Sequence, residues 1–353
     1  MEKPKVLILY NKLFHYRIPI WNLLSEKCDL TITYCEGGLP DGIQRNFNVE
    51  YIPYKKIGPF VWHKANLRRK AKQYDAVIAY GDIMWVKYML LPWFSKIKVA
   101  YWTIGVTTSD GYDTKPQKDF LFRFFYRKAK ALIFYSDNPI AKYLEHGFRR
   151  ESLFVANNTV EVIETNTPEN KDYITFIGTL HKRKGVNLLL ESYLALKDKC
   201  SLPRLVIVGN GPEFDNITKW ITDNNMSNLI EMKGSVIDPV IKADILSHAL
   251  ACISPKQAGL SVLECMGYGV PFVTTKDAIT GGERFNIHNN VDGIVMDNEQ
   301  QLKDVVLDIS QSPEKYIQMG KKAKDYYQNY RTPQQMADGL WETICYLIKD
   351  SEK

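Results

Sequence analysis

The sequence lacks the features that place a chain across a membrane or send it through one. No apolar run approaches the roughly 18 residues that a spanning helix needs, and Pro92 interrupts the run Tyr88–Phe94. The first residues, MEKPKVLILYNK, have too short an apolar stretch for a signal peptide and no cleavage site of small residues. We therefore expect a protein that is made and kept in the cytoplasm.

The cysteine content and the net charge are also low. The six cysteines show no Cys-x-x-Cys spacing, which disfavours a zinc site or a redox pair and favours buried, reduced thiols. The net charge of +6 suits an anionic ligand or an anionic membrane surface and does not call for nucleic acid. The basic residues are clustered, in His63–Lys72 and in Lys115–Lys130, and the second cluster is interleaved with aromatic residues.

What the sequence does have is a regular alternation of short apolar runs with helical stretches. The chain has 353 residues, more than one hydrophobic core usually organises. The runs typical of buried strands are Lys5–Tyr10, Asp29–Tyr34, Ala76–Tyr80, Val99–Thr103, Ala131–Tyr135, Tyr173–Ile177, Arg204–Val208, Leu229–Lys233, Ala251–Ser254 and Pro271–Thr274. This pattern predicts an α/β protein with two Rossmann-like domains, at 1–165 and 166–325, joined in the polar stretch Glu164–Lys171 and followed by helices over Pro313–Lys349. Such domains bind ligands in the cleft between them, at the carboxyl ends of the strands.

Two stretches of the second half place glycines and cations just after predicted strands. In Ile174–Gly185 a strand ends at Gly178, and the loop that follows carries Lys182, Arg183 and Lys184. These cations suit a diphosphate, although a solvated charge run is the alternative. In Leu205–Pro212 a strand ends in Gly209 and Gly211, which let a ligand or a neighbouring backbone approach, or form a plain turn. The third glycine of the dinucleotide fingerprint is missing, which disfavours a nicotinamide enzyme.

The stretch Ile253–Thr275 is the most informative one. A strand ends at Pro255, and the loop Lys256–Gly259 opens a helix near Leu260. The backbone N–H groups at such a helix start bind phosphate without a metal. Glu264 lies about one turn into this helix, where a carboxylate suits a ribose diol, or is an ordinary exposed helix residue.

These stretches, in this order and spacing, resemble the carboxyl-terminal domain of the family-4 retaining glycosyltransferases (glycosyl transferase group 1), which have the GT-B fold of two Rossmann-like domains facing each other across a cleft. The matching positions are Gly178, Leu180, Lys184 and Gly185, then Gly209, Gly211 and Pro212, then Ser254, Pro255, Gly259, Leu260, Glu264, Met266, Gly269 and Pro271. Met232–Val236 matches the family's base-binding segment, and His15–Leu23 resembles the first loop and helix of members that assemble bacterial surface polysaccharides. The resemblance covers most of the chain and is strongest from Tyr173 to Met296.

The resemblance implies transfer of a sugar, with retention, from a UDP- or GDP-sugar to a saccharide or polyprenyl-linked acceptor in capsule, O-antigen or other cell-surface glycan assembly. It implies no cofactor and no metal, and the sequence has no Asp-x-Asp. On this basis we predict that Lys184 and Arg183 act at the diphosphate and Glu264 at the ribose. The other predicted donor-binding positions are Gly178, Thr179, Gly209, Gly211, Lys233, Gly234, Lys256, Gly259, Leu260, Ser261 and Glu283, and the alternative for Glu283 is a surface-loop residue. The resemblance also implies that the last helix, in 326–353, packs back on the first domain.

Three positions depart from the family pattern. Lys256 replaces the first of two paired glutamates, Thr179 replaces an arginine, and Ile104 stands where many relatives carry a histidine. A cation at position 256 suits the donor's diphosphate or a carboxylate on an acidic sugar. The departures leave two other functions open: a catalytically lapsed GT-B-like binding protein, and a sugar-nucleotide epimerase of the same fold.

The acceptor is expected against the first domain, where Asn11, His15 and Arg17 follow the first strand. Arg17 is predicted either to meet an acceptor phosphate or to pair with a surface acid. Phe120–Lys130 fits a basic, aromatic surface that rests on the inner face of a membrane, or a helix that packs its aromatic side chains into the core.

Overall fold

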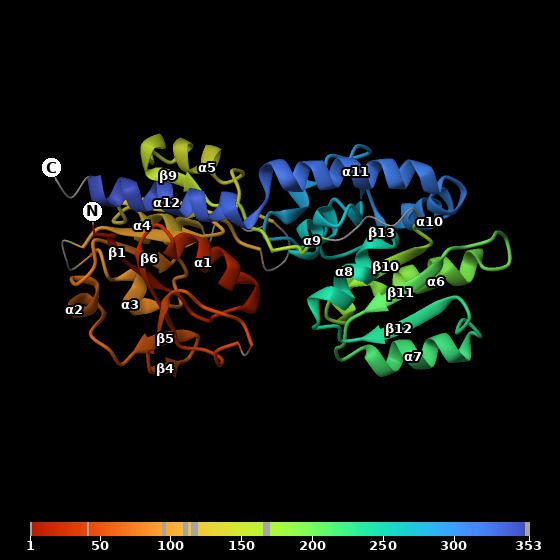
Figure 1. Cartoon of the computed structure of the whole chain (residues 1–353), viewed down its shortest axis with the longest axis horizontal. Coiled ribbons are helices and arrows are strands. Elements are labelled where there is room, and N and C mark those ends of the chain that lie inside the picture. The colour runs from red at the N-terminus through yellow and green to blue at the C-terminus, as the bar shows by residue number, and fades with distance from the viewer. Residues whose placement is uncertain are drawn as a thin grey trace. The chain divides into compact units, whose positions relative to one another are not determined.

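The structure is a computed structural model, and it describes residues 2–40, 42–93, 97–108, 112–113, 119–164 and 170–349. The chain divides into two compact units (Figure 1). Unit 1 contains residues 1–107, 113–160 and 332–353, and unit 2 contains residues 108–112 and 161–331. Most of the predicted linker, residues 165–169, lies outside the described part. Among the described residues, no helix is both long and apolar enough to cross a membrane.

Unit 1 is built on a seven-stranded parallel sheet with the order β3-β2-β1-β6-β7-β8-β9. Its strands are β1 (Lys5–Leu9), β2 (Asp29–Tyr34), β3 (Asn48–Tyr51), β6 (Ala76–Tyr80), β7 (Val99–Thr103), β8 (Ala131–Phe134) and β9 (Leu153–Val155). Alternate residues of β1 enter two different cores, since Val6 and Ile8 join one cluster and Leu7 and Leu9 join the other. The sheet is therefore covered on both faces, as the unbroken apolar run of β1 predicts.

The helices of unit 1 cover these two cores. They are α1 (Ile18–Ser25), α2 (Leu67–Ala71), α3 (Val86–Met89), α4 (Asp119–Tyr126), α5 (Ile140–Glu145) and α12 (Pro333–Lys349). The short 3-10 helices η1 (His15–Arg17) and η3 (Arg150–Ser152) and an antiparallel hairpin of β4 (Tyr54–Ile57) and β5 (Phe60–His63) complete the unit. The hairpin, β3 and β9 are not among the predicted strands.

Unit 2 has a six-stranded parallel sheet with the order β12-β11-β10-β13-β14-β15. Its strands are β10 (Tyr173–Ile177), β11 (Arg204–Val208), β12 (Ile230–Gly234), β13 (Ala249–Ile253), β14 (Phe272–Thr275) and β15 (Gly293–Met296). Its helices are α6 (Val186–Leu196), α7 (Phe214–Asp223), α8 (Pro239–Ser247), α9 (Ser261–Gly267), α10 (Leu302–Gln311) and α11 (Pro313–Tyr330), with 3-10 turns η4 (Lys182–Lys184), η5 (Glu283–Asn286) and η6 (Glu299–Gln301). The ten predicted strands all form, with their ends shifted by at most two residues.

The last helix, α12, belongs to unit 1 although it follows unit 2 in the chain. Figure 1 shows it in dark blue beside the red α1 and the yellow-green β9, and it contacts both. Its apolar face, with Leu340 and Ile344, is fully buried in the core that also holds β1. The chain returns to unit 1 at Thr332 rather than at 326, because α11 continues to Tyr330 inside unit 2.

Candidate functional site

The three stretches singled out in the sequence follow β10, β11 and β13, which are neighbours in the sheet of unit 2. Parallel strands end at the same edge of their sheet, so the loops that follow them meet there. The loop after β10 is joined to its neighbours by backbone hydrogen bonds, from Leu180 N–H to Asn210 O at 2.9 Å and from Lys256 N–H to Lys184 O at 3.3 Å. The fold thus brings the three predicted stretches together.

Lys184 is the half-buried cation of this edge. It ends the turn η4, and Gly185 follows with φ 73°, a left-handed conformation that glycine takes without strain, before α6 begins. Its Nζ lies against Gly178, where a Cβ would collide with it. Burial first, and then the charge of Arg183, lower the pKa of Lys184. Lys182 and Arg183 are exposed.

Gly209 and Gly211 serve the packing of one loop on another. A Cβ on Gly209, which has φ 148°, would collide with the carbonyl oxygen of Gly178. A Cβ on Gly211 would lie 2.5 Å from the carbonyl oxygen of Leu180. The structure thus contains the close approach of a neighbouring backbone, and it also contains a turn in which Phe214 N–H donates to the Gly211 carbonyl oxygen at 3.0 Å.

The loop after β13 is fixed by hydrogen bonds before α9 begins. Ser254 Oγ donates to the Gln257 carbonyl oxygen at 2.7 Å, and Thr275 Oγ1 donates to the Pro255 carbonyl oxygen at 2.8 Å. The start of α9 at Ser261 has no side-chain cap, so no side chain of its own covers the first N–H groups. Gly259, Leu260 and Ser261, which are predicted to offer N–H groups to the donor, lie at this helix start.

Glu264 and Lys256 each form an ion pair that the sequence does not reveal. Glu264 Oε1 lies 2.6 Å from the Nζ of Lys242 on α8, and its side chain is only 15 % exposed. The alternative of an ordinary exposed helix glutamate is therefore wrong. Lys256 Nζ lies 3.0 Å from Oε2 of Glu299 on η6, and both side chains are about half exposed or less.

A pocket of about 550 Å³ in unit 2 is lined by two of the predicted cations. Arg183 and Lys256 line it, whereas Lys184 and Glu264 do not. The other lining residues are Thr275, which ends β14, and residues that follow β14 and β15: Asp277, Ile279, Asn298, Glu299 and Gln300. The pocket therefore lies at the carboxyl ends of four strands and offers two cations and two carboxylates.

The remaining predicted donor residues have local roles. Glu283 is 7 % exposed, and its Oε2 accepts hydrogen bonds from Gly281 N–H at 2.9 Å and Thr280 Oγ1 at 3.2 Å. It is therefore no surface-loop residue. Lys233 pairs with Glu231 at 2.6 Å, and the Gly234 carbonyl oxygen accepts from Gly209 N–H at 2.7 Å. Thr179 is exposed beside Gly178.

In unit 1 the structure corrects the expected environment of Arg17. Its side chain is buried rather than on the surface, and it donates to Asn158 Oδ1 and contacts the sulfur of Met336 on α12. Its guanidinium lies 5.4 Å from the ring centre of Trp102. The expectation of a surface acid is wrong, because aromatic rings and an amide surround this cation.

The other two acceptor-side residues remain at the surface. His15 is exposed, and its ring meets the edge of Tyr16. The main-chain carbonyl oxygen of Asn11 accepts hydrogen bonds from the N–H groups of Cys35 and Glu36, which fixes the loop after β1.

Comparison with known proteins agrees with this architecture. The structure of Anabaena HepE in complex with UDP-glucose matches with a TM-score of 0.73 and 16 % identity, covering 97 % of this chain and 100 % of that one. The fold is GT-B. Residues 158–326 of this GT-B chain match the family described as Glycosyl transferases group 1.

Two curated relatives match half of the chain. An uncharacterized glycosyltransferase of Haemophilus influenzae is 26 % identical over 194 residues, which are 50 % of this chain and 52 % of that protein. A GDP-mannose-dependent alpha-(1-6)-phosphatidylinositol monomannoside mannosyltransferase of Mycobacterium tuberculosis is 22 % identical over 191 residues, 50 % of this chain and 46 % of that protein. The chain thus spans about half the length of the curated relatives that it matches.

Sequence reasoning missed three charged residues at this edge of the sheet. Lys242, Asp277 and Glu299 come from α8, from the loop after β14 and from η6. Asp277 was within reach of the sequence, because it follows a predicted strand. Lys242 and Glu299 carried no signal, since only the packing of α8 on α9 and of η6 on the Lys256 loop brings them into place.

Proposed function

We propose that the chain is a retaining glycosyltransferase that moves a sugar from a UDP- or GDP-sugar to a saccharide or lipid-linked saccharide in cell-surface glycan assembly. The observation that carries the proposal is the environment of Lys184. Its ammonium is half-buried against Gly178, and within residues 170–349 no carboxylate pairs with it. A cation withdrawn from water without a carboxylate partner favours an anionic ligand.

Sugar transfer requires that the departing nucleoside diphosphate be stabilised while the acceptor hydroxyl attacks. We propose that Lys184 and Arg183 contact the diphosphate and that the N–H groups at the start of α9 add to them. These fixed donors take the part that a metal ion takes in other sites, so the proposed reaction is metal-independent. Glu264 uses Oε1 for Lys242, and its other oxygen is proposed to accept from the ribose.

Known relatives support the nucleotide and acceptor classes. HepE was solved with UDP-glucose, and the mycobacterial relative is named for GDP-mannose and a phosphatidylinositol mannoside. The proposed donor therefore carries either UDP or GDP, and the proposed acceptors include lipid-linked saccharides. For this chain a nucleotide sugar is the proposed donor, with the acceptor bound on the side of Asn11 and His15.

Because the proposed acceptor is lipid-linked, contact of the chain with a membrane is also part of the proposal. The surface of α4 gives it partial support, because Phe120, Leu121 and Phe124 are 60 %, 43 % and 49 % exposed. Tyr126 of the same helix is buried, so part of the aromatic stretch belongs to the core. Residues 115–118 of the basic cluster lie outside the described part.

Replacing Lys184 tests the proposed donor site. The chain is incubated with UDP- and GDP-sugars and a mixture of saccharide and lipid-linked acceptors, and both nucleoside diphosphate and glycosylated product are measured. We expect Lys184→Ala to lower kcat/KM about a hundredfold or more, because the charge of the leaving diphosphate loses its half-buried partner. Lys182→Ala is the matched control: it removes an exposed lysine of the same turn and is expected to change little.

The same assay separates the other two functions. Product formed without any acceptor would identify an epimerase. Binding of UDP or GDP, with no nucleoside diphosphate released from any donor sugar, would identify a lapsed binding protein. The anomeric configuration of the product, read by NMR, tests retention. Activity that EDTA abolishes and a divalent cation restores would contradict metal independence.

A further inference from the structure

We propose that the β4–β5 hairpin of unit 1 docks the chain onto an anionic lipid surface. The hairpin lies outside the donor site and outside α4. The inference therefore goes beyond the proposed function and holds whether or not the chain transfers a sugar.

The strand register gives the hairpin two different faces. Its turn has two residues, and Gly58 takes φ 58°, as the first central residue of a tight hairpin turn requires. The pairs Ile57–Phe60 and Lys55–Trp62 share one face, because residues directly opposite in an antiparallel pair point to the same side. The pairs Tyr54–His63 and Lys56–Val61 share the other face.

The inner face fixes the hairpin to the body of unit 1. Val61 is 4 % exposed, and its N–H donates to the Met84 carbonyl oxygen at 2.7 Å. His63 is fully buried and stacks on Tyr88 with ring centres 4.3 Å apart. These contacts hold the backbone, so the outer face is presented in a fixed arrangement.

The outer face exposes an apolar patch at the turn. Ile57 is 57 % exposed, Phe60 46 % and Trp62 43 %, and neighbouring Met84 is 43 % exposed. Single exposed apolar residues are ordinary, but a group of four with two large aromatic rings marks an interaction surface.

A strong excess of positive charge surrounds this patch. Residues 51–74 contain seven lysines and arginines and no aspartate or glutamate. Lys56 pairs with Glu36 at 3.1 Å and Lys70 pairs with Glu50, and both acids lie outside this segment. Lys55 and Lys64 are exposed beside the aromatic residues.

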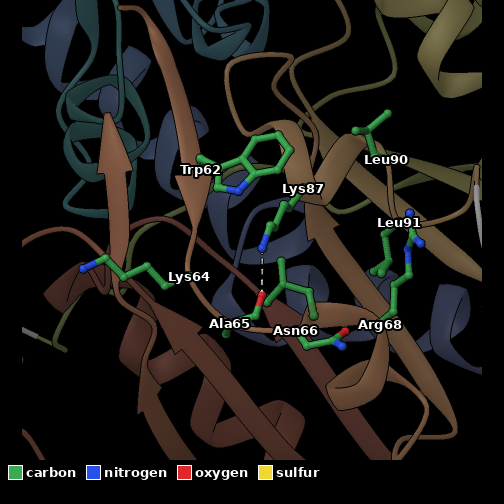
Figure 2. A pocket seen from close by; sticks show the side chains of 9 residues that line it. Trp62, Lys64, Ala65, Asn66, Arg68, Lys87, Leu90 and Leu91 are labelled. Carbon is green, nitrogen blue, oxygen red and sulfur yellow. Dashed lines mark hydrogen bonds between the residues drawn. The ribbon is translucent and has the colours of Figure 1, made fainter. Parts of the chain in front are cut away.

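Beside Trp62 lies a pocket of about 330 Å³ with a basic lining (Figure 2). Lys87 extends from α3 toward it, donates to the Ala65 carbonyl oxygen at 3.1 Å, and lies 5.4 Å from the ring centre of Trp62. Arg68 and Lys64 line the same pocket. The hairpin thus combines apolar anchors with a basic hollow large enough for a phosphate group.

The charge decides which partner fits this surface. A second copy of the hairpin would bring two sets of cations together and would be repelled. A leaflet rich in anionic lipid attracts the cations and accepts the apolar side chains, and tryptophan favours the headgroup region of a bilayer. Apolar anchors and a polybasic patch together provide the two signals that a stable membrane contact needs.

Vesicle co-sedimentation of the full chain tests the inference. The chain is mixed with vesicles of phosphatidylcholine alone or phosphatidylcholine with phosphatidylglycerol, at low and high salt. We expect binding to the anionic vesicles only, weakened by salt. Phe60→Ser with Trp62→Ser, and separately Lys55→Ala with Lys64→Ala, should each weaken the partition coefficient about tenfold or more.

Two matched pairs of substitutions serve as controls. Ile237→Ser with Val240→Ser removes two apolar side chains of unit 2 that are 86 % and 64 % exposed. Phe120→Ser with Leu121→Ser removes two exposed apolar side chains of α4. Both are expected to leave most of the hairpin-dependent binding intact. Thermal unfolding of each variant checks that it is folded. If the variant with Phe60→Ser and Trp62→Ser (the serine pair) unfolds, the variant with Lys55→Ala and Lys64→Ala (the lysine pair) still tests the inference.

Three results would overturn the inference. They are no binding to anionic vesicles, binding that only the α4 pair weakens, and self-association in light scattering that the serine pair abolishes. The last would identify a second copy as the occupant. Absence of sugar transfer with intact vesicle binding would contradict only the proposed function. Absence of vesicle binding with intact sugar transfer would contradict this inference and leave the proposed transfer reaction standing.

Discussion

Lys184 shows how one residue links burial to ligand binding. Burial, and then the charge of Arg183, lower the pKa of Lys184. Protonation of this lysine is therefore less favourable in the folded chain than in the unfolded one. Its contribution to stability therefore rises as the pH rises through the lowered pKa. A bound diphosphate has the opposite effect, because a nearby anion favours the protonated ammonium.

This opposition predicts a pH dependence of nucleotide binding. We expect the affinity for UDP or GDP to fall as the pH rises through the lowered pKa of Lys184, and at a lower pH than for an ordinary lysine. Calorimetric titration at a series of alkaline pH values measures it. Lys184→Arg is the control, since arginine stays protonated and should flatten this part of the profile. An equal fall in both proteins would assign it to another group.

At the scale of single residues, sequence reasoning found positions but not partners. Lys184, Lys256 and Glu264 stand out because they follow predicted strands or open a helix. Their surroundings depend on residues from other segments, such as Lys242 beside Glu264 and Glu299 beside Lys256. Arg17 was misjudged for the same reason, because α12 and Asn158 enclose it only after the chain has folded.

At the scale of elements, the glycines of the β11 loop set how closely two loops pack. Gly209 meets the carbonyl oxygen of Gly178, a backbone atom that cannot rotate away, and its φ of 148° is one that other residues rarely adopt. The loop that carries Lys184 therefore depends on a small residue in the neighbouring loop.

Substituting one of these glycines should destabilise unit 2. We expect Gly209→Ala to cost about 2–5 kcal/mol, because the strained φ and the backbone collision add. Gly259→Ala is the control, since a Cβ there meets nothing within 4 Å. Urea unfolding of both variants provides the comparison. A midpoint for Gly209→Ala equal to that of the control would show that the two loops can move apart.

Long apolar runs were predicted well as elements, and short amphipathic ones were not. β1 (KVLIL) and β10 (YITFI) are mostly apolar, which fits a strand buried on both faces. The sequence of β4, YKKI, has no such run, and its pairing with β5 depends on the turn at Gly58 and Pro59. The hairpin therefore became visible only in the structure.

At the scale of the whole molecule, α12 closes unit 1 after the chain has completed unit 2. Its contact with α1 joins the two ends of the chain, and Lys27 on the segment after α1 pairs with Asp338 at 2.6 Å. Unit 1 therefore reaches its full core only when the last residues are in place.

Truncating a core residue of α12 should affect unit 1 alone. Leu340 is fully buried, and we expect Leu340→Ala to cost about 2–5 kcal/mol. Hydrogen exchange should show lower protection in β1, β8 and α1 and little change in β10 and β13, because the two sheets have separate cores. Glu342→Ala, an exposed change on the same helix, is the control. Equal loss of protection in both units would show that they unfold together.

The sequence by itself determined the two parallel sheets and the three stretches that meet at the carboxyl edge of the second one. It could do so because strand burial, loop glycines and helix starts are local properties, written in runs of neighbouring residues. Only the tertiary structure decided what surrounds each charged side chain, where the last helix packs, and which face of the hairpin is exposed. These depend on contacts between residues far apart in the chain, and a local pattern of residue types does not specify such contacts.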